Sequence, residues 1–209
     1  MARMTRDSAT LVGDLAKAHI AARCLHVVAD FGVADALGEQ VASAAQLAQQ
    51  TGLHADALER ILRQLAAHAA FEERAGGYAH NDASRRLRGD HPESLRSYVR
   101  MTGMPAFWDR YTELHHAAVN GAPALGWTSM LERFAANPTE GSIFNAAMIA
   151  KSRRAVRVVA DAYDWRAFGS IVDVGGGRGH LLAAGVERAP APRGILFELP
   201  PVIADTAVQ

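Results

Sequence analysis

The sequence predicts an α-helical N-terminal domain, followed by the first β-α-β portion of a parallel α/β domain. Apolar residues recur at helical spacing early in the chain, most clearly over residues 9–37, and Gly32 breaks this pattern. Near the other end, a short β-branched run, Ile171–Val174, precedes a glycine-rich loop and a helical stretch, Leu181–Arg188. A second apolar run then closes on an acid, Glu198. Strand, glycine turn, helix and strand in this order are typical of the start of a doubly wound sheet.

Composition limits the function classes. The 209 residues have a formal net charge of zero, which argues against a nucleic-acid partner, because neutralising phosphates needs excess Lys and Arg. Cys24 is the single cysteine, so no internal disulfide is possible and a cytoplasmic location is expected. No apolar stretch is long enough to span a bilayer. The nine histidines lack metal-ligand spacing, and we expect no metal site.

Residues 41–80 have the pattern of a winged helix. Ser43 is a good N-cap for a helix over 44–50, and a second helix is expected over 56–68. Residues 71–80 then predict a β-hairpin with Gly76 and Gly77 at its tip. Helix, turn, helix and two-stranded wing can form either a DNA-binding module or a dimerisation platform.

The charges of this unit favour dimerisation. The face that a DNA-binding helix would present carries a mixed set, Glu59, Arg60 and Arg63. If the wing bound DNA, Glu72 and Glu73 would face the negatively charged phosphates. A DNA-binding regulator therefore remains the weaker alternative.

The middle of the chain predicts helices with an aromatic and Met-rich composition. Asn137 is expected to cap a helix, with Pro138 in its first turn and Glu140 reaching back as in a capping box. Phe144 and Met148 are one turn apart on this helix and share a face. A second helical stretch is expected over 154–162. Large apolar groups such as these form either core or the walls of a site for a flat ligand.

The glycine loop distinguishes two cofactor classes. The dinucleotide fingerprint G-x-G-x-x-G fails, because His180 stands where the third glycine belongs. Asp173-Val-Gly-Gly-Gly-Arg-Gly179 instead resembles the first motif of S-adenosylmethionine-dependent methyltransferases. Glu198 lies about 20 residues further on, where an acid accepts hydrogen bonds from both ribose hydroxyls.

On these motifs the chain resembles the two-domain small-molecule O-methyltransferases, which include caffeate, acetylserotonin and bacterial polyketide methyltransferases. Phe144-Asn-x-x-Met148-x-x-x-Ser152 and Phe197-Glu198-Leu199-Pro200 belong to the same resemblance. It implies a winged-helix dimerisation domain, then the opening part of a Rossmann-like α/β methyltransferase domain. The implied domains are 9–92 for dimerisation, 93–165 for a helical connector around the substrate pocket, and 166–209 for a partial cofactor domain.

The resemblance also implies residue roles. S-adenosylmethionine is the expected cofactor, with the acceptor pocket beside it and a homodimer formed through the N-terminal helices. The cofactor-binding residues would be Ser152, Asp173, Gly175, Gly176, Gly177, Gly179, Glu198 and Leu199. The acceptor-pocket residues would be Met104, Trp108, Phe144 and Met148.

The resemblance further implies that a catalytic histidine lies beyond Gln209, and no histidine of this chain matches its motif. We therefore expect a C-terminally shortened relative, assign no catalytic residue, and predict weak cofactor binding without turnover. A truncated gene product, a deliberately shortened chain and half of a split protein are all compatible with this. A non-catalytic dimerisation partner is the alternative function.

Overall fold

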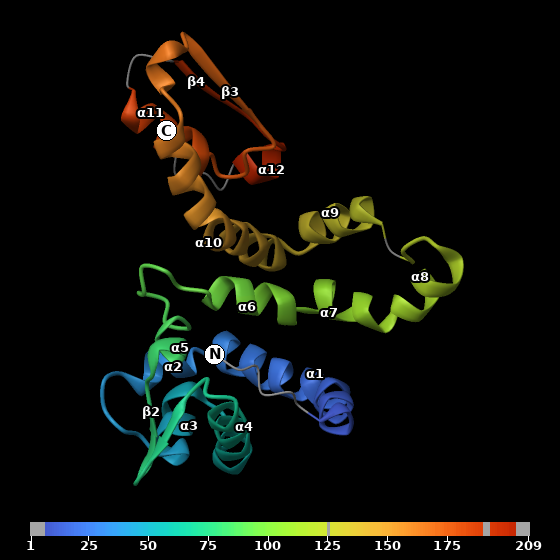
Figure 1. Ribbon diagram of the computed structural model, residues 1–209, viewed down its shortest axis with the longest axis vertical. Coiled ribbons are helices and arrows are strands. Elements are labelled where there is room, and N and C mark those ends of the chain that lie inside the picture. Colours follow the sequence, from blue (N-terminus) through green and yellow to red (C-terminus); the bar gives the residue numbers. More distant parts are fainter. Residues whose placement is uncertain (1–6, 125, 190–192, 204–209) are drawn as a thin grey trace. The chain divides into compact units, whose positions relative to one another are not determined.

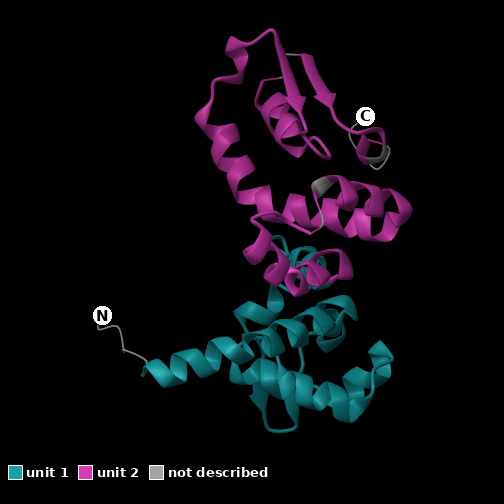
Figure 2. Cartoon of the chain, turned by 90° about the vertical axis from the view of Figure 1, so that its right-hand side faces the viewer, with its two compact units in different colours: residues 1–103 teal, residues 104–209 magenta. Residues whose placement is uncertain are grey.

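The structure is a computed structural model that describes residues 7–124, 126–189 and 193–203. The chain divides into two compact units, residues 1–103 and 104–209 (Figure 2). The order of the elements along the chain can be followed in Figure 1. Parts of the predicted third domain, residues 190–192 and 204–209, lie outside the described residues.

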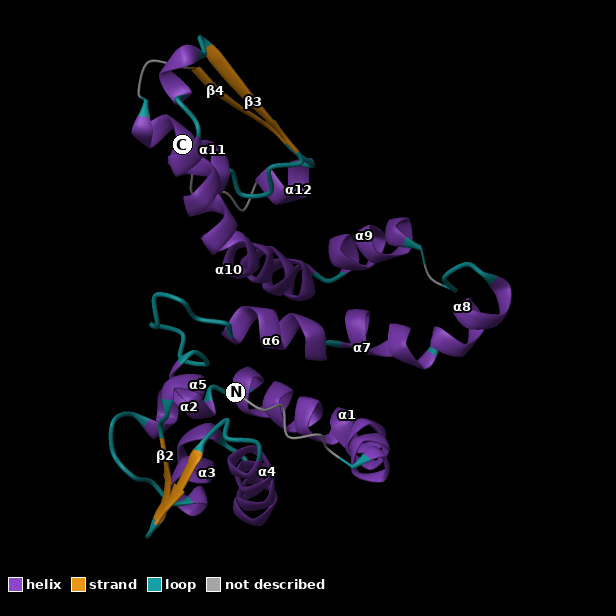
Figure 3. Cartoon of the chain, in the orientation of Figure 1, coloured by secondary structure: helices purple, strands orange, loops and turns teal. Residues whose placement is uncertain are grey.

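The first unit is helical apart from one hairpin (Figure 3). Its elements are α1 (Ser8–Asp30), α2 (Val33–Leu37), α3 (Ala44–Thr51), α4 (Ala55–Ala67), β1 (Glu72–Arg74), β2 (Gly77–Ala79), α5 (Asp82–Arg85) and α6 (Arg96–Gly103). The predicted break at Gly32 is confirmed, because Gly32 has a φ of +66° and separates α1 from α2. A side chain is strained in that left-handed conformation, which glycine adopts freely.

The helix start at Ser43 is also confirmed. Its hydroxyl accepts from the Gln46 N–H, and the Gln46 side chain accepts from the Ser43 N–H, which completes a capping box. The hairpin forms one residue earlier than expected, since Arg74 pairs with Gly77 and the turn falls on Ala75 and Gly76. Gly77 belongs to the strand, where a Cβ would lie 2.2 Å from the Ala42 carbonyl oxygen.

The hydrophobic core of this unit lies between the hairpin and the helices α1, α2, α3 and α4. Its fully buried large side chains come from α1, α2, α3, α4 and the hairpin region: Val28, Val33, Leu47, Leu58, Leu62, Leu65, Phe71 and Tyr78. The Tyr78 hydroxyl donates to a Glu59 carboxylate oxygen at 2.9 Å. Burial together with this carboxylate raises the pKa of Tyr78 to about 12.

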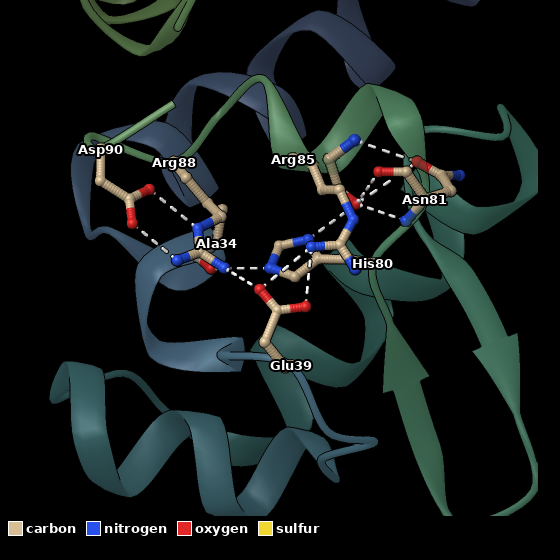
Figure 4. A network of polar contacts seen from close by, with 8 residues as sticks. Ala34, Glu39, His80, Asn81, Arg85, Arg88 and Asp90 are labelled. Atoms are coloured by element: carbon tan, nitrogen blue, oxygen red, sulfur yellow. Dashed lines mark hydrogen bonds and ion pairs between the residues drawn. The ribbon is translucent and has the colours of Figure 1, made fainter. Parts of the chain in front are cut away.

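The first unit also contains a network of polar side chains (Figure 4). Glu39 accepts from both Arg85 and Arg88, and Arg88 also pairs with Asp90. The neutral His80 ring is held between the Ala34 carbonyl, 3.0 Å from Nε2, and the Ser84 hydroxyl, 2.9 Å from Nδ1. These bonds tie α2 to the segment that follows the hairpin.

The second unit begins with helices and ends in a parallel strand pair (Figure 3). Its elements are α7 (Pro105–Thr112), α8 (Leu114–Asn120), α9 (Trp127–Ala136), α10 (Pro138–Ala162), the 3₁₀ turn η1 (Trp165–Ala167), β3 (Ser170–Val174), α11 (His180–Arg188), β4 (Arg193–Phe197) and α12 (Pro200–Ile203).

Two expectations for α10 are corrected. Its two predicted stretches form one continuous helix of 25 residues, because neither proline nor glycine interrupts residues 142–162. Asn137 caps it as predicted, accepting from the Glu140 N–H. The Glu140 side chain does not complete a capping box; it accepts two hydrogen bonds from Arg133, at 2.8 and 3.1 Å, and so joins α9 to α10.

The parallel strands have one covered face and one exposed face. Gly194 of β4 lies under Leu182 and Val186 of α11, while Trp165 packs on Gly185 of the same helix. On the opposite face, Val174 is 72% exposed and its pairing partner Phe197 is 67% exposed. Among the described residues, no element covers this outer face of β3.

No helix within the described ranges combines the length and the apolar character needed to cross a membrane.

Candidate cofactor-binding site

The glycine loop lies between β3 and α11, as the sequence predicts. Gly175, Gly177 and Gly179 have φ values of +70°, +59° and +71°. Three left-handed residues within five positions reverse the chain from the strand into the helix, and only glycine adopts these dihedrals without strain. At Gly175 and Gly177 a Cβ would enter open space, so backbone conformation is what requires glycine there.

Gly176 meets a different requirement. A Cβ at this position would lie 2.4 Å from the Asp173 carboxyl carbon. Gly176 therefore makes room for the Asp173 side chain beneath the loop. The Oδ2 atom of Asp173 is buried and has no hydrogen-bond partner among the described residues. A buried acceptor without a donor is costly, and a ligand donor would remove that cost.

Glu198 faces the same loop from the end of β4. Its Oε2 accepts from the Gly177 N–H at 2.8 Å, and its Oε1 accepts from the Leu199 N–H at 2.7 Å. The structure thus brings together the loop and the acid, which are 21 positions apart in the sequence. Each carboxylate oxygen keeps a second lone pair for a hydroxyl donor.

Ser152 approaches the loop from α10. Its hydroxyl lies 2.6 Å from the Met148 carbonyl oxygen and 2.6 Å from Nε2 of His180, the first residue of α11. Burial lowers the pKa of His180, with Asp173 acting in the opposite direction and Arg153 in the same one. His180 was absent from the predicted site, because the sequence marks it only as a residue replacing the third glycine of another motif.

An apolar cavity of about 450 Å³ lies within the second unit, and Leu199, the residue after Glu198, lines part of it. Its described lining comes from α9, α10 and the α12 region: Leu131, Phe134, Ala135, Pro138, Gly141, Ser142, Phe144, Asn145, Leu199 and Val202. Phe144 and Leu199 are predicted site residues. Met104, Trp108 and Met148 are not part of this described lining, and their acceptor role stays a prediction.

Aromatic rings surround Phe144. Its ring centroid lies 5.0 Å from that of Phe134 and 6.1 Å from that of Phe107. Trp108 instead contacts Tyr111, edge to face at 5.8 Å. The sequence does not identify Phe134 as a site residue, because its contact with Phe144 depends on how α9 packs against α10.

Among the side chains that the structure describes, no group of three or more His, Cys, Asp or Glu residues is placed to hold a metal ion.

Two family models match the chain. One describes the O-methyltransferase dimerisation domain and matches residues 14–90. The other describes the O-methyltransferase domain and matches residues 108–209.

Individual proteins agree with these matches. The mitomycin biosynthesis 6-O-methyltransferase of Streptomyces lavendulae is 33% identical over 196 residues, which are 91% of this chain and 56% of that protein. The chain thus spans little more than half the length of this curated relative.

Two solved structures share the fold. CalO1, a methyltransferase of calicheamicin biosynthesis in its SAH-bound form, superimposes with a TM-score of 0.79 at 31% identity, covering 100% of this chain and 63% of that one. NcsB1, an O-methyltransferase from neocarzinostatin biosynthesis in complex with S-adenosylhomocysteine and 1,4-dihydroxy-2-naphthoic acid, gives 0.72 at 29% identity, covering 88% and 57%.

Proposed function

We propose a cofactor site and a reaction from one premise: the chain belongs to the family of S-adenosylmethionine-dependent O-methyltransferases that combine a dimerisation domain with a methyltransferase domain. In this proposal the loop at 175–179 and Glu198 hold S-adenosylmethionine. The observation that supports the proposal is the 2.8 Å hydrogen bond from the Gly177 N–H to Glu198, which joins the loop to the acid.

The residues present fit this cofactor. The unpartnered Oδ2 of Asp173 suits the ammonium end of the methionine part, and the glycine backbone at 175–179 lets that part approach closely. The free lone pairs of Glu198 suit the ribose hydroxyls. Ser152 and Leu199 complete the cofactor-binding set. All of these side chains and backbone groups come from the second unit.

Bound S-adenosylmethionine supplies an electrophilic methyl group on a sulfonium. The residues of the chain orient the acceptor and exclude water from it. Apolar walls around Phe144 and Leu199 provide both effects, because they line a cavity of about 450 Å³. The described lining contains no titratable side chain, so in this proposal the hydroxyl proton is taken by a group outside this lining.

The acceptor in our proposal is a flat, hydroxylated aromatic or polyketide-like molecule. The apolar lining and the ring cluster of Phe134 and Phe144 offer a surface on which a planar aromatic ring can pack. NcsB1 was solved with 1,4-dihydroxy-2-naphthoic acid, a compound of this kind. Because the chain spans about half the length of its curated relatives, transfer itself remains a proposal for the whole protein.

The N-terminal unit is proposed to form a homodimer through a winged-helix domain over residues 9–92. A helix pair followed by a two-stranded hairpin is present, and α1 exposes Leu15 at 67%. The rival DNA-binding function gains nothing from the structure, since Arg63 pairs with Glu59 and Arg74 pairs with Glu72. A dimerisation partner without activity would use the same α1 surface.

Calorimetric titration with S-adenosylhomocysteine tests the cofactor site. We expect weak but saturable binding by the chain and an affinity loss of about tenfold or more for Glu198→Ala, since a charge-assisted hydrogen bond contributes about 1.5–3 kcal/mol. Glu187→Ala, which removes an exposed acid from α11, is the matched control and should bind as the original chain does.

Equal loss of affinity in both variants, or no binding by the original chain, would overturn the cofactor site. Competition between 1,4-dihydroxy-2-naphthoic acid and an apolar fluorescent probe then tests the cavity. Leu131→Trp narrows the cavity from α9 and should weaken that competition.

A further inference from the structure

A partly buried polar cluster beside the glycine loop contains one side chain that the cofactor site has not used. Ser152 of α10, Asp173 of β3 and His180 of α11 come from three elements of the second unit. Ser152 and His180 are in direct contact, 2.6 Å apart. Asp173 lies near enough that its charge acts to raise the pKa of His180, against the larger effect of burial.

The hydrogen bonds of Ser152 fix the tautomer of His180. The hydroxyl has a single hydrogen, which points to the Met148 carbonyl oxygen at 2.6 Å. Towards His180 the Ser152 oxygen therefore accepts, and Nε2 must be the ring nitrogen that bears hydrogen. In the neutral ring this leaves a lone pair on Nδ1.

Two acceptors in the cluster consequently lack a donor. Nδ1 of His180 and Oδ2 of Asp173 are both buried, and neither has a hydrogen-bond partner among the described residues. Two buried acceptors close to one carboxylate charge suit a cationic group with several N–H donors. A water molecule could also donate to them, but it carries no positive charge to pair with Asp173.

We infer that Nδ1 of His180 and Oδ2 of Asp173 jointly accept hydrogen bonds from the α-ammonium group of the cofactor, and that a proton on His180 competes with this group. The inference rests on the proposed cofactor function. Protonation would place a hydrogen on Nδ1, which removes one acceptor and repels the ammonium. Asp173 would then pair with the imidazolium instead of the ligand.

The inference predicts a pH-dependent affinity. Asp173 from β3 and Arg153 from α10 are the charged groups that act on the ring, and burial favours its neutral form. S-adenosylhomocysteine should bind best when His180 is neutral. Below the pKa of His180, its affinity should fall by up to tenfold for each pH unit, because one proton is displaced for each ligand bound.

Two substitutions separate the two nitrogens. His180→Gln keeps an N–H donor at the position of Nε2 for Ser152, but it has no acceptor at Nδ1 and does not titrate. His180→Asn keeps an amide oxygen near Nδ1 and loses the bond to Ser152. We expect affinity at pH 8 to fall more in His180→Gln than in His180→Asn, with a flat profile between pH 5 and 8 in both.

The test is calorimetric titration of the full chain with S-adenosylhomocysteine between pH 5 and 8, together with ¹⁵N spectra of the histidine rings. 5′-Methylthioadenosine is the matched ligand, because it keeps the adenosyl part and lacks the ammonium. Its affinity should not depend on the protonation state of His180. The spectra should show His180 with hydrogen on Nε2 at pH 8, which is a readout independent of any ligand.

Each outcome decides a different point. Binding with the same pH profile in the original chain and in His180→Gln would overturn this inference and leave the cofactor site standing. An Nδ1–H tautomer would overturn it as well. No binding of either ligand by any form would overturn the proposed function, and this inference with it.

Discussion

The glycines of the loop satisfy two separate physical requirements. Gly175, Gly177 and Gly179 supply left-handed backbone, whereas Gly176 leaves space for Asp173. A methyl group at 176 would press on the Asp173 carboxyl carbon from 2.4 Å, which only a shift of that side chain or of the loop can relieve. The position of the buried carboxylate therefore depends on the absence of one carbon atom.

Gly176→Ala should displace Asp173 and weaken S-adenosylhomocysteine binding by about tenfold or more, with a loss of stability of about 1–3 kcal/mol from overpacking. Calorimetry and urea unfolding measure the two effects. Gly126→Ala is the control, because its Cβ would enter open space and its φ of −74° suits any residue. Unchanged binding in Gly176→Ala would show that Asp173 has no part in the site.

His80 makes the first unit sensitive to acid. Burial lowers the pKa of His80 from its ordinary 6.5, and both ring nitrogens are used in the neutral state. The unfolded chain takes up a proton that the folded ring resists. The stabilisation from His80 is therefore complete above pH 6.5 and is lost as the pH falls below that value towards the pKa of the folded state.

The free energy of unfolding of the first unit should thus decrease below pH 6.5, by up to about 1.4 kcal/mol per pH unit for this one group. In His80→Gln the pH slope should be smaller, although the variant is less stable throughout. His54→Gln alters an exposed ring without a cap hydrogen bond and should keep the original slope. Urea unfolding followed by the amide signals of α3 and α4 gives the slope, and equal slopes in all three proteins would refute this role.

At the scale of elements, sequence patterns predicted what local interactions decide. Ser43 and Asn137 cap their helices as expected, and Gly32 ends α1, because each effect depends on neighbours within four positions. The pairing of the loop with Glu198 was also predictable, since consecutive parallel strands end at the same edge.

Contacts between elements were not predictable in the same way. Glu140 reaches Arg133 across the α9–α10 turn instead of its own cap, and Ser152 meets His180 from 28 positions away. Each of these contacts depends on how two helices pack against each other, and hydrophobic periodicity in the sequence carries no information about that packing. The cavity lining was missed for the same reason, apart from Phe144 and Leu199.

Helix α1 presents an apolar surface that a dimer would bury. Leu11, Val12 and Leu15 are 44%, 66% and 67% exposed, and Leu11 and Leu15 are one turn apart. Burying one such side chain contributes about 1.5–3 kcal/mol to the stability of a dimer. In a symmetric interface the same residue is buried on both subunits, so this contribution counts twice.

We expect light scattering to give twice the 22.4 kDa chain mass, and Leu15→Glu to raise the dimer dissociation constant by about a hundredfold or more. Lys17→Glu changes the net charge by more than Leu15→Glu does, but Lys17 lies on the other side of α1. The Lys17→Glu variant should therefore stay dimeric. A dimer that survives Leu15→Glu but not Lys17→Glu would place the interface elsewhere.

At the scale of the whole molecule, the sheet remains open on one side. Val172, Val174, Ile195 and Phe197 share the exposed face, and the register pairs them across β3 and β4. Parallel sheets are normally covered on both faces. The described chain therefore displays an apolar patch that is uncommon on a protein surface.

This patch should bind the dye anilinonaphthalene sulfonate while the chain is folded. Val174→Thr combined with Phe197→Thr should reduce the bound fluorescence by about half or more, with unchanged circular dichroism. Val119→Thr, at a position that is 70% exposed on α8, should leave the fluorescence as it was. Equal fluorescence in all three proteins would mean that the sheet face is covered in solution.

The central claim is that one adenosyl ligand contacts both the glycine loop and Glu198. Titration of the ¹⁵N-labelled chain with S-adenosylhomocysteine, followed by amide chemical shifts, tests it most directly. We expect the largest shifts to fall together on Gly175, Gly177, Gly179 and Glu198, with one common dissociation constant. Shifts confined to the first unit, or loop signals that stay in place at saturation, would contradict it.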